Sequence, residues 1–243
     1  MPCASPKIPL ARALGAMPNP RMTRAIFLVF LLLSACGRPL TEAEKSFASS
    51  LYGPDLDPAR IRLVDGHFAS NYTFRYPARP RVTCSERIFP PPPSDTITTS
   101  PGAITLFHKV FVREDLYVAD FTSQNNLYDL MLFAHEMAHI WQWQNRKRTH
   151  YHPLKAASEH QTTTDPYLFD LTTSTNFLDY TYEQQAAIIE EFTCCRALAP
   201  KASRTARLHK MLSKALPVVR LQSKIDAHAK VPWRGAKLAG ICD

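Results

Sequence analysis

The residues whose types and spacing most clearly indicate chemistry are His135, Glu136 and His139, which form the pattern HExxH. Residues four apart lie on one face of an α-helix, so both imidazoles can bind one Zn²⁺. The glutamate between them is then placed to act as general base on a water molecule at the metal. This pattern is typical of zinc hydrolases. The alternative is a pair of helix histidines that are hydrogen-bonded to carbonyl groups or to water.

Residues 127–144 are expected to form the helix that carries these three side chains. The segment contains neither Gly nor Pro, and Asn125 or Asn126 can cap its N-terminus. Apolar residues recur in it at spacings of three and four, which predicts a buried helix. Burying three ionisable groups without partners is costly, and a metal that accepts both imidazole lone pairs removes much of that cost. The helix therefore favours one bound Zn²⁺.

A catalytic zinc ion usually has a third protein ligand besides two histidines. A further histidine six residues after His139 would fall at position 145, which is Asn145. A glutamate from a second helix is the other common solution, and residues 181–192 are the best candidate for that helix. We predict Glu183 as the ligand. Glu190 lies two helical turns further on, on nearly the same face, and is expected either to hold a histidine or to be the ligand itself.

Longer stretches around these motifs resemble one family. HEMAHIWQWQ and the later YEQQAAIIEEF are similar to a group of bacterial zincin-fold proteins, some described as Vgr-related or Rhs-associated, that pair HEMTHVWQ with EQQA. LTEAEKSFASSLYGPDLDPARIRLV is also similar, so the likeness covers most of residues 39–198. The resemblance implies a gluzincin-type fold. In that fold His135 and His139 bind zinc from one helix, Glu183 binds it from another, and a small sheet borders the substrate cleft.

One position departs from the pattern of this family. Glutamate-type zincins commonly carry an acidic residue four positions after the ligand glutamate, where it holds the first histidine. Ala187 stands at that position in this chain. We therefore expect Glu190, Asp179 or a backbone carbonyl to hold the histidine instead.

Residues 1–35 are expected to be a lipoprotein signal peptide. Arg21 and Arg24 precede an apolar stretch, residues 25–33, that is too short to span a bilayer comfortably. The sequence Leu-Ser-Ala-Cys that ends at Cys36 resembles the lipobox of bacterial lipoproteins, in which cleavage precedes the cysteine and its thiol carries the lipid. An ordinary signal peptide or an uncleaved anchor is the alternative. The segment before Arg21 is long for a signal peptide, and Met17 or Met22 would give a more usual length, so the upstream residues are either an extended n-region or a mis-called start.

Lipidation at Cys36 predicts a protein bound to the membrane of a bacterial cell envelope. Gly37, rather than Asp, follows the cysteine, and by resemblance to lipoprotein sorting this favours the outer membrane, facing the periplasm. The chain carries a net charge of +8, and residues 1–35 contribute four of these charges. Residues 201–237 are basic and are expected to form a solvated helix face or to contact anionic lipid headgroups. Nucleic acid is not expected as a partner outside the cytoplasm.

Export also predicts that the remaining cysteines are oxidised. Cys84, Cys194, Cys195 and Cys242 form an even set once Cys36 is lipidated, which indicates two disulfides. Neighbouring cysteines on a helix point in different directions, so Cys194 and Cys195 are expected to bond to Cys84 and Cys242, in either order. A thiolate metal site is the alternative, and no C-x-x-C spacing supports it.

The other elements follow from local patterns. A helix is expected from about Leu40 to Tyr52, and a polar loop is expected over residues 145–175. Three histidines of that loop, His150, His152 and His160, can be ligands, hydrogen-bond donors or solvated side chains. Strands are expected at 59–64, 103–107 and 109–112, a proline-rich surface loop at 77–101 and a helix within 201–214.

The sequence thus predicts an α+β, zincin-like fold in which residues 36–243 form one domain after a short tether. A small sheet would pack on the HExxH helix and on a second, glutamate-bearing helix. The expected activity is zinc-dependent hydrolysis of a peptide or protein substrate, with Glu136 as general base and Tyr180, Tyr182 or His152 stabilising the oxyanion. The alternatives are a catalytically weak or inactive envelope lipoprotein that binds a partner, and an amidase acting on cell-wall peptides.

Overall fold

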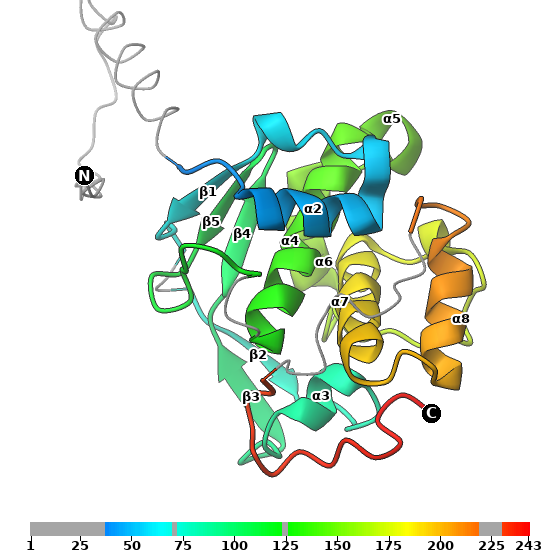
Figure 1. Cartoon of the computed structure of the whole chain (residues 1–243). Coiled ribbons are helices and arrows are strands. Elements are labelled where there is room, and N and C mark those ends of the chain that lie inside the picture. The colour runs from blue at the N-terminus through cyan, green and yellow to red at the C-terminus, as the bar shows by residue number, and fades with distance from the viewer. Residues whose placement is uncertain (1–36, 70–71, 123–125, 219–229) are drawn as a thin grey trace, which may run out of the picture.

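Two small β-sheets and a set of helices make up a mixed α+β structure (Figure 1). The structure is a computed structural model that describes residues 37–69, 72–122, 126–218 and 230–243. The predicted signal peptide and lipidation site, residues 1–35 and Cys36, lie outside the described residues. None of the described helices is both long and apolar enough to cross a membrane.

The larger sheet has the strand order β1-β5-β4. Its strands are β1 (Arg62–Asp65), β4 (Ala103–Leu106) and β5 (Lys109–Val112). Strand β1 is parallel to β5, whereas β4 is antiparallel to β5 and forms one edge of the sheet. The two strands predicted at 103–107 and 109–112 are confirmed. The strand predicted at 59–64 begins later because Pro58–Arg60 forms a short 3-10 helix, η2, capped by Asp57.

The proline-rich stretch is more ordered than the loop that the sequence predicted. It contributes β3 (Thr96–Thr99), which pairs antiparallel with β2 (Phe74–Pro77) in a second sheet, and the short helix α3 (Cys84–Ile88). The four residues of β3 are β-branched, which favours a strand, and the prolines at 90–93 fall between α3 and β3.

Helix α4 (Leu127–Gln144) carries the HExxH pattern and matches the predicted helix, with Asn126 as its N-cap. It packs side by side with α7 (Tyr182–Leu198), the predicted glutamate-bearing helix, and also contacts strand β4. Helix α8 (Ser203–Leu212) packs on another side of α7. In Figure 1 the order from left to right is therefore the larger sheet, α4, α7 and α8.

Helix α2 (Glu42–Tyr52) matches the first predicted helix and leads into the 3-10 helix η1 (Gly53–Asp55). Thr41 and Glu44 form the expected capping box, in which each side chain accepts from the backbone N–H of the other residue. The hydroxyl of the fully buried Tyr52 donates to the carbonyl of Ala134 at 3.0 Å. This bond fixes α2 against α4 one residue before the first histidine of the pattern.

The predicted polar loop over residues 145–175 contains two helices, α5 (Arg146–Thr149) and α6 (Pro153–Thr162). His152 caps α6 through its imidazole, and Pro153 occupies the first turn, where its missing N–H costs nothing. Only Pro153 and Ala156 of α6 are buried, so the helix has too few apolar residues for its period to be recognised from sequence. A further 3-10 helix, η3 (Phe177–Asp179), precedes α7.

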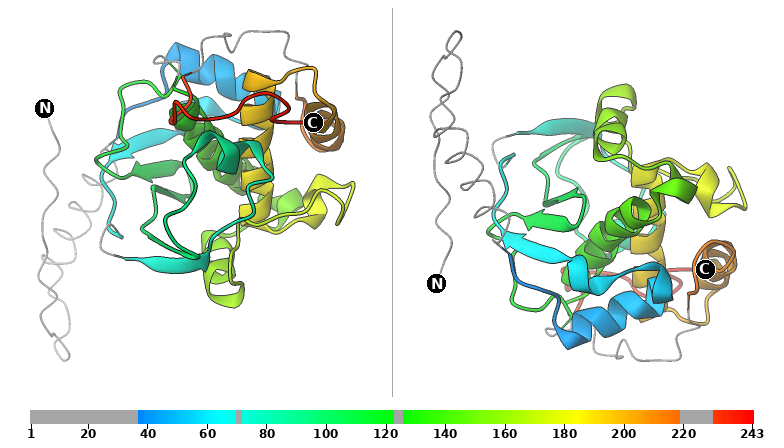
Figure 2. Two further views of the ribbon diagram at one scale, coloured as in Figure 1. Left: turned by 90° about the horizontal axis from the view of Figure 1, so that it is seen from below. Right: turned by 90° about the horizontal axis from the view of Figure 1, so that it is seen from above.

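Two disulfides form, as predicted, and the structure selects their order: Cys84 bonds to Cys194, and Cys195 bonds to Cys242. The first joins α3 to α7, and the second joins α7 to the C-terminal segment. That segment, residues 230–243, runs past α3 and ends near α8, as Figure 2 shows from two sides. Arg87 donates to the carbonyls of Ala239 and Gly240, which holds the segment against α3.

Candidate metal centre

The structure brings His135, His139 and Glu183 together between α4 and α7. The Nε2 atoms of His135 and His139 lie 3.4 and 3.3 Å from the same carboxylate oxygen, Oε2 of Glu183. All three residues are buried, with 5–7% of their surface exposed. Because the three ligand atoms lie within 4.8 Å of one another, this group can hold a metal ion.

The second nitrogen of each imidazole faces a hydrogen-bond acceptor. Nδ1 of His135 lies 3.2 Å from Oε2 of Glu190, and Nδ1 of His139 lies 2.9 Å from Oε1 of Gln142. The amide nitrogen of Gln142 donates to the carbonyl of Tyr182 and to the side-chain oxygen of Gln185, so its oxygen is left to accept from His139. Since Nδ1 of each histidine donates to one of these acceptors, Nε2 is the nitrogen that faces Glu183 and is available to a metal ion.

Two imidazole nitrogens and a carboxylate oxygen that face one another in a buried site attract a positive charge, which protons or a metal ion can supply. The pKa values of His135 and Glu183 are shifted in the directions that such a charge distribution produces. Burial alone would lower the pKa of His135, but the hydrogen bonds that its imidazolium donates to Glu183 and Glu190 outweigh burial and raise the pKa to about 10. Burial would raise the pKa of Glu183, but the neighbouring histidines hold it well below its usual range. Two imidazole nitrogens and one carboxylate oxygen are a donor set that fits Zn²⁺.

Helix α6 holds Glu183 in place. The backbone N–H groups of Tyr182 and Glu183 donate to the two carboxylate oxygens of Glu159 at 2.9 and 3.0 Å, so Glu159 caps the N-terminus of α7. Nε2 of His160 lies 3.6 Å from Oε1 of Glu183. The sequence singled out His160 only as one of three loop histidines, and it contained no signal for Glu159, because the helix that carries both residues was not predicted.

Glu136 lies on α4, between the two histidines, and faces the larger sheet. The hydroxyl of Thr105, from the edge strand β4, donates to Oε2 of Glu136 at 2.6 Å. Both residues are buried, and Glu136 is 6% exposed. In the residues that the structure describes, Oε1 of Glu136 accepts no hydrogen bond. Thr105 was within a predicted strand, but its partner could not be read from sequence because α4 and β4 are brought together only by tertiary packing.

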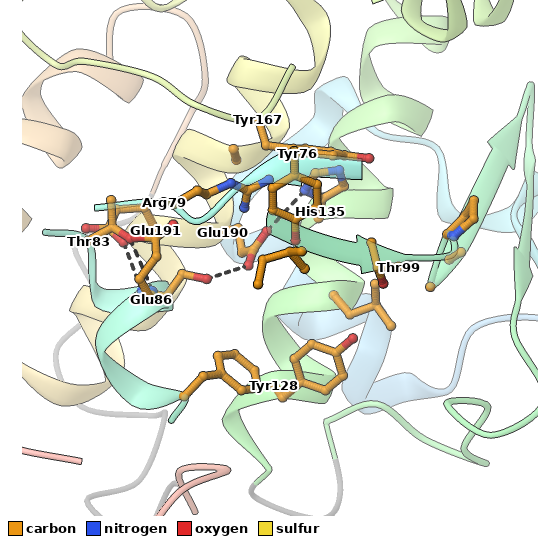
Figure 3. Close-up of a pocket in the computed structure, with 18 of the residues that line it drawn as sticks. Tyr76, Arg79, Thr83, Glu86, Thr99, Tyr128, His135, Tyr167, Glu190 and Glu191 are labelled. Atoms are coloured by element: carbon orange, nitrogen blue, oxygen red, sulfur yellow. Dashed lines mark hydrogen bonds and ion pairs between the residues drawn. The ribbon is translucent and has the colours of Figure 1, made fainter. Parts of the chain in front are cut away.

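A cavity of about 470 Å³ adjoins this group, and His135, Glu136 and Glu190 lie along it (Figure 3). Its walls come from the second sheet, α3, α4 and α7. The lining is rich in aromatic side chains, which are Phe74, Tyr76, Phe89, Tyr128, Tyr167 and Phe169. An open cleft with aromatic walls beside a group that can hold a metal is a common form of ligand-binding site.

Two tyrosines flank the histidine pair. The Tyr167 ring lies 5.7 Å from that of His135, and the Tyr151 ring lies 5.8 Å from that of His139, measured between ring centroids. Arg79 lies over the Tyr167 ring and is itself bound to Asp165 by two hydrogen bonds of 2.5 and 2.8 Å. Burial, with the carboxylates of Glu183 and Glu136, raises the pKa of Tyr167 well above its ordinary value. Its hydroxyl therefore stays a hydrogen-bond donor at neutral pH.

The tyrosines and the histidine predicted as oxyanion donors are engaged elsewhere. The Tyr180 hydroxyl donates to the carbonyls of Asp170 and Ser174, and the Tyr182 hydroxyl donates to the carbonyl of His150. His152 caps α6 through Nδ1. Sequence reasoning missed Tyr151 and Tyr167 because both lie in the segment that it treated as a loop, where no periodic pattern marks a residue as buried.

The structure shows which of the predicted acidic residues, Glu190 or Asp179, contacts His135. Glu190 contacts His135, whereas the carboxylate of Asp179 accepts hydrogen bonds from Ser174 and Asn176 and is exposed. Glu190 also accepts from the hydroxyl of Ser85 at 3.0 Å, which links the site to α3. Glu190 therefore makes the contact with His135 that the family pattern assigns to an acidic residue at position 187.

No protein-family model matches this chain, and no curated protein matches it. Among solved structures, the effector domain of Pseudomonas aeruginosa VgrG2b is similar, with 23% sequence identity and a TM-score of 0.47. The match covers 79% of this chain and 93% of that domain. At this identity and TM-score the likeness carries no conclusion about function.

Replacing Glu190 with Gln is expected to weaken Zn²⁺ binding by about 10- to 100-fold, because a ligand histidine loses the carboxylate that orients its ring. The dissociation constant can be measured by competition with a chromogenic chelator. Asp179→Asn is the matched control, since the same chemical change there should leave the affinity unaltered. Equal loss in both variants would remove Glu190 from this role.

Proposed function

We propose that this chain is a zinc-dependent peptidase of the zincin type, anchored to a bacterial envelope by lipid. The observation that carries the proposal is the group His135, His139 and Glu183, which faces one point beside Glu136 and opens onto an aromatic cavity. A site that only stabilised the fold would need no such cavity, nor a carboxylate with a free oxygen at its wall.

In this proposal the two histidines and Glu183 hold one Zn²⁺. When bound, the ion supplies a Lewis acid that polarises a peptide carbonyl and makes a water molecule more acidic. Glu136 accepts the proton from that water on the oxygen that Thr105 leaves free, and then delivers it to the departing amine. The hydrogen bond from Thr105 keeps the carboxylate turned so that one oxygen faces the cavity.

The substrate would lie extended beside β4. This strand is the edge of the larger sheet in the part of the chain that the structure describes, and it contacts α4 directly. An extended peptide can add to such an edge through backbone hydrogen bonds, with alternate side chains directed toward the cavity. This arrangement supports cleavage of a peptide or protein rather than of a small rigid substrate.

The oxyanion that forms at the attacked carbonyl would be stabilised by Tyr167 in place of the residues that the sequence suggested. Its ring lies beside His135, Arg79 holds the ring in position, and its hydroxyl is protonated. A donor of this kind lowers the barrier only when it is fixed before the reaction begins.

The envelope location follows from the sequence around Cys36. The lipobox-like residues support attachment of the mature chain to a membrane by its first residue, and two disulfides support an oxidising compartment. The protein would then act on periplasmic peptides or proteins.

Glu136→Gln is expected to reduce peptide hydrolysis by at least about 1,000-fold, because the amide cannot accept the proton from water. Zn²⁺ binding should be retained. Digestion of a peptide library, analysed by mass spectrometry with and without chelator, measures the first effect, and metal analysis measures the second. Unchanged cleavage by the variant contradicts the assignment. Stoichiometric zinc without cleavage by the wild type would favour a binding module instead.

Tyr167→Phe is expected to lower kcat by about 100-fold with little effect on zinc affinity, since only the hydrogen bond to the oxyanion is lost. Steady-state kinetics on a cleaved peptide provides the measurement. Tyr180→Phe removes a hydroxyl that bonds to backbone carbonyls outside the site, and it should retain kcat. A fully active Tyr167→Phe enzyme would rule out this donor.

Cys36→Ser is expected to move the protein from the membrane fraction to the soluble fraction, because the thiol that carries the lipid is absent. Detergent phase partitioning of the wild type and the variant tests this. If the wild type is already soluble, the lipid anchor is refuted while the peptidase proposal stands.

A further inference from the structure

One carboxyl group that lines the cavity has no part in the metal centre. Glu86 lies on α3 as a half-buried residue, and its Oε2 atom is buried without a hydrogen-bond partner in the described part of the chain. Among the described residues, no cation forms an ion pair with it. Burying an unpaired carboxyl group costs free energy, so an unpaired group at the wall of a cavity indicates a partner that binds there.

The other charged groups along the cavity already have partners. Arg79 is bound to Asp165, Arg113 to Asp115, Glu190 to His135 and Ser85, Glu191 to Arg204, and Glu136 to Thr105. Arg81 donates to the carbonyl of Arg87 and lies over the ring of Trp233. Apart from Glu136, which we assign to the chemical step, Glu86 is thus the described carboxyl group along this cavity that is left to meet a ligand.

The helix that carries Glu86 is fixed in place. The Cys84–Cys194 disulfide joins it to α7, and the backbone N–H of Cys84 donates to Glu191 at 2.8 Å. The hydroxyl of Thr83 accepts from the backbone N–H of Glu86, which caps the helix. Glu86 is therefore held at a set position relative to the helix that provides Glu183, as a recognition group requires.

The electrostatic surroundings favour a cation at this position. Burial raises the pKa of Glu86 to about 7, Arg79 opposes this effect, and the carboxylates of Glu190 and Glu191 add to it. A positive charge brought into the cavity would interact favourably with all three carboxyl groups. The aromatic walls provide a surface on which the methylene stem of a long cationic side chain can lie.

We propose that Glu86 selects substrates by binding the positively charged side chain of a lysine or arginine residue in the peptide. This inference rests on the proposed peptidase function and names the substrate class of the same site. Glu86 is a specificity-determining residue here, and it takes no part in the chemical step.

The test compares two peptides that differ only in a lysine or a norleucine at one position, which is scanned along both sides of the cleaved bond. At one position the wild type is expected to favour lysine by about tenfold in kcat/KM, as for a hydrogen bond to a charged group. Glu86→Gln should reduce this ratio to about one. Glu114→Gln, the same change at an exposed carboxylate outside the cavity, should leave both the ratio and the activity unaltered.

A binding measurement separates the two proposals. n-Pentylammonium, a mimic of the lysine side chain, should shift NMR signals of the wild type at concentrations at which n-hexanol does not, and Glu86→Gln should lose this response. If peptides are cleaved without a lysine preference, Glu86 has no such role and the peptidase proposal stands. If the amine binds through Glu86 but nothing is cleaved, the cation site stands and the peptidase proposal falls. If no peptide is cleaved and n-pentylammonium does not bind, both the peptidase proposal and the cation site are overturned.

Folding of the Gln variant can be checked independently. Because the pKa of Glu86 is raised from 4.5 to about 7, the wild type loses stability as pH rises from about 4.5 through 7, where the buried carboxyl group ionises. The neutral amide avoids this loss, so Glu86→Gln is expected to be at least as stable as the wild type at pH 8. A variant that loses the lysine preference while its unfolding temperature is maintained supports recognition rather than misfolding.

Discussion

The site depends on two buried imidazole nitrogens, from His135 and His139, that face one carboxylate oxygen of Glu183. Nδ1 of His135 faces Glu190 and Nδ1 of His139 faces Gln142, so the Nε2 atoms are the nitrogens that face Glu183. A carboxylate between two imidazole nitrogens attracts positive charge, either as protons on the imidazoles or as a metal ion that replaces them. Most of the polar contacts around the site maintain the orientation of these three groups.

A chain of hydrogen bonds connects the metal-facing part of the site to the substrate-facing part. Glu190 contacts His135 through one carboxylate oxygen and Ser85 through the other. Ser85 is next to Glu86, so the proposed recognition group and a candidate metal ligand are both positioned through α7 and α3. The position of a bound side chain relative to the metal is thereby set by two helices that are covalently joined.

Local patterns predicted much of the candidate metal centre. Residues 127–144 form a helix because apolar residues recur at its period, and a helix alone brings His135 and His139 to one face. Glu183 was predicted because residues 181–192 also show a helical pattern of apolar residues. The contributions of Tyr167, Glu159 and Thr105 depend on tertiary packing, and no local pattern marks them. Helix α6 was missed because it buries too few residues, and its place over the site is set by contacts such as Glu159 with the start of α7.

The neighbouring cysteines of α7 bond in different directions, Cys194 to α3 and Cys195 to the C-terminal segment. A helix joined on one side alone can still turn about its axis within its packing, whereas two covalent attachments at successive residues oppose rotation in both senses. Glu183 and Glu190 share this helix, and rotation would move both carboxylates away from His135. The rotation of α7 about its axis, and with it the direction of Glu183, is thus restricted by covalent bonds as well as by side-chain packing.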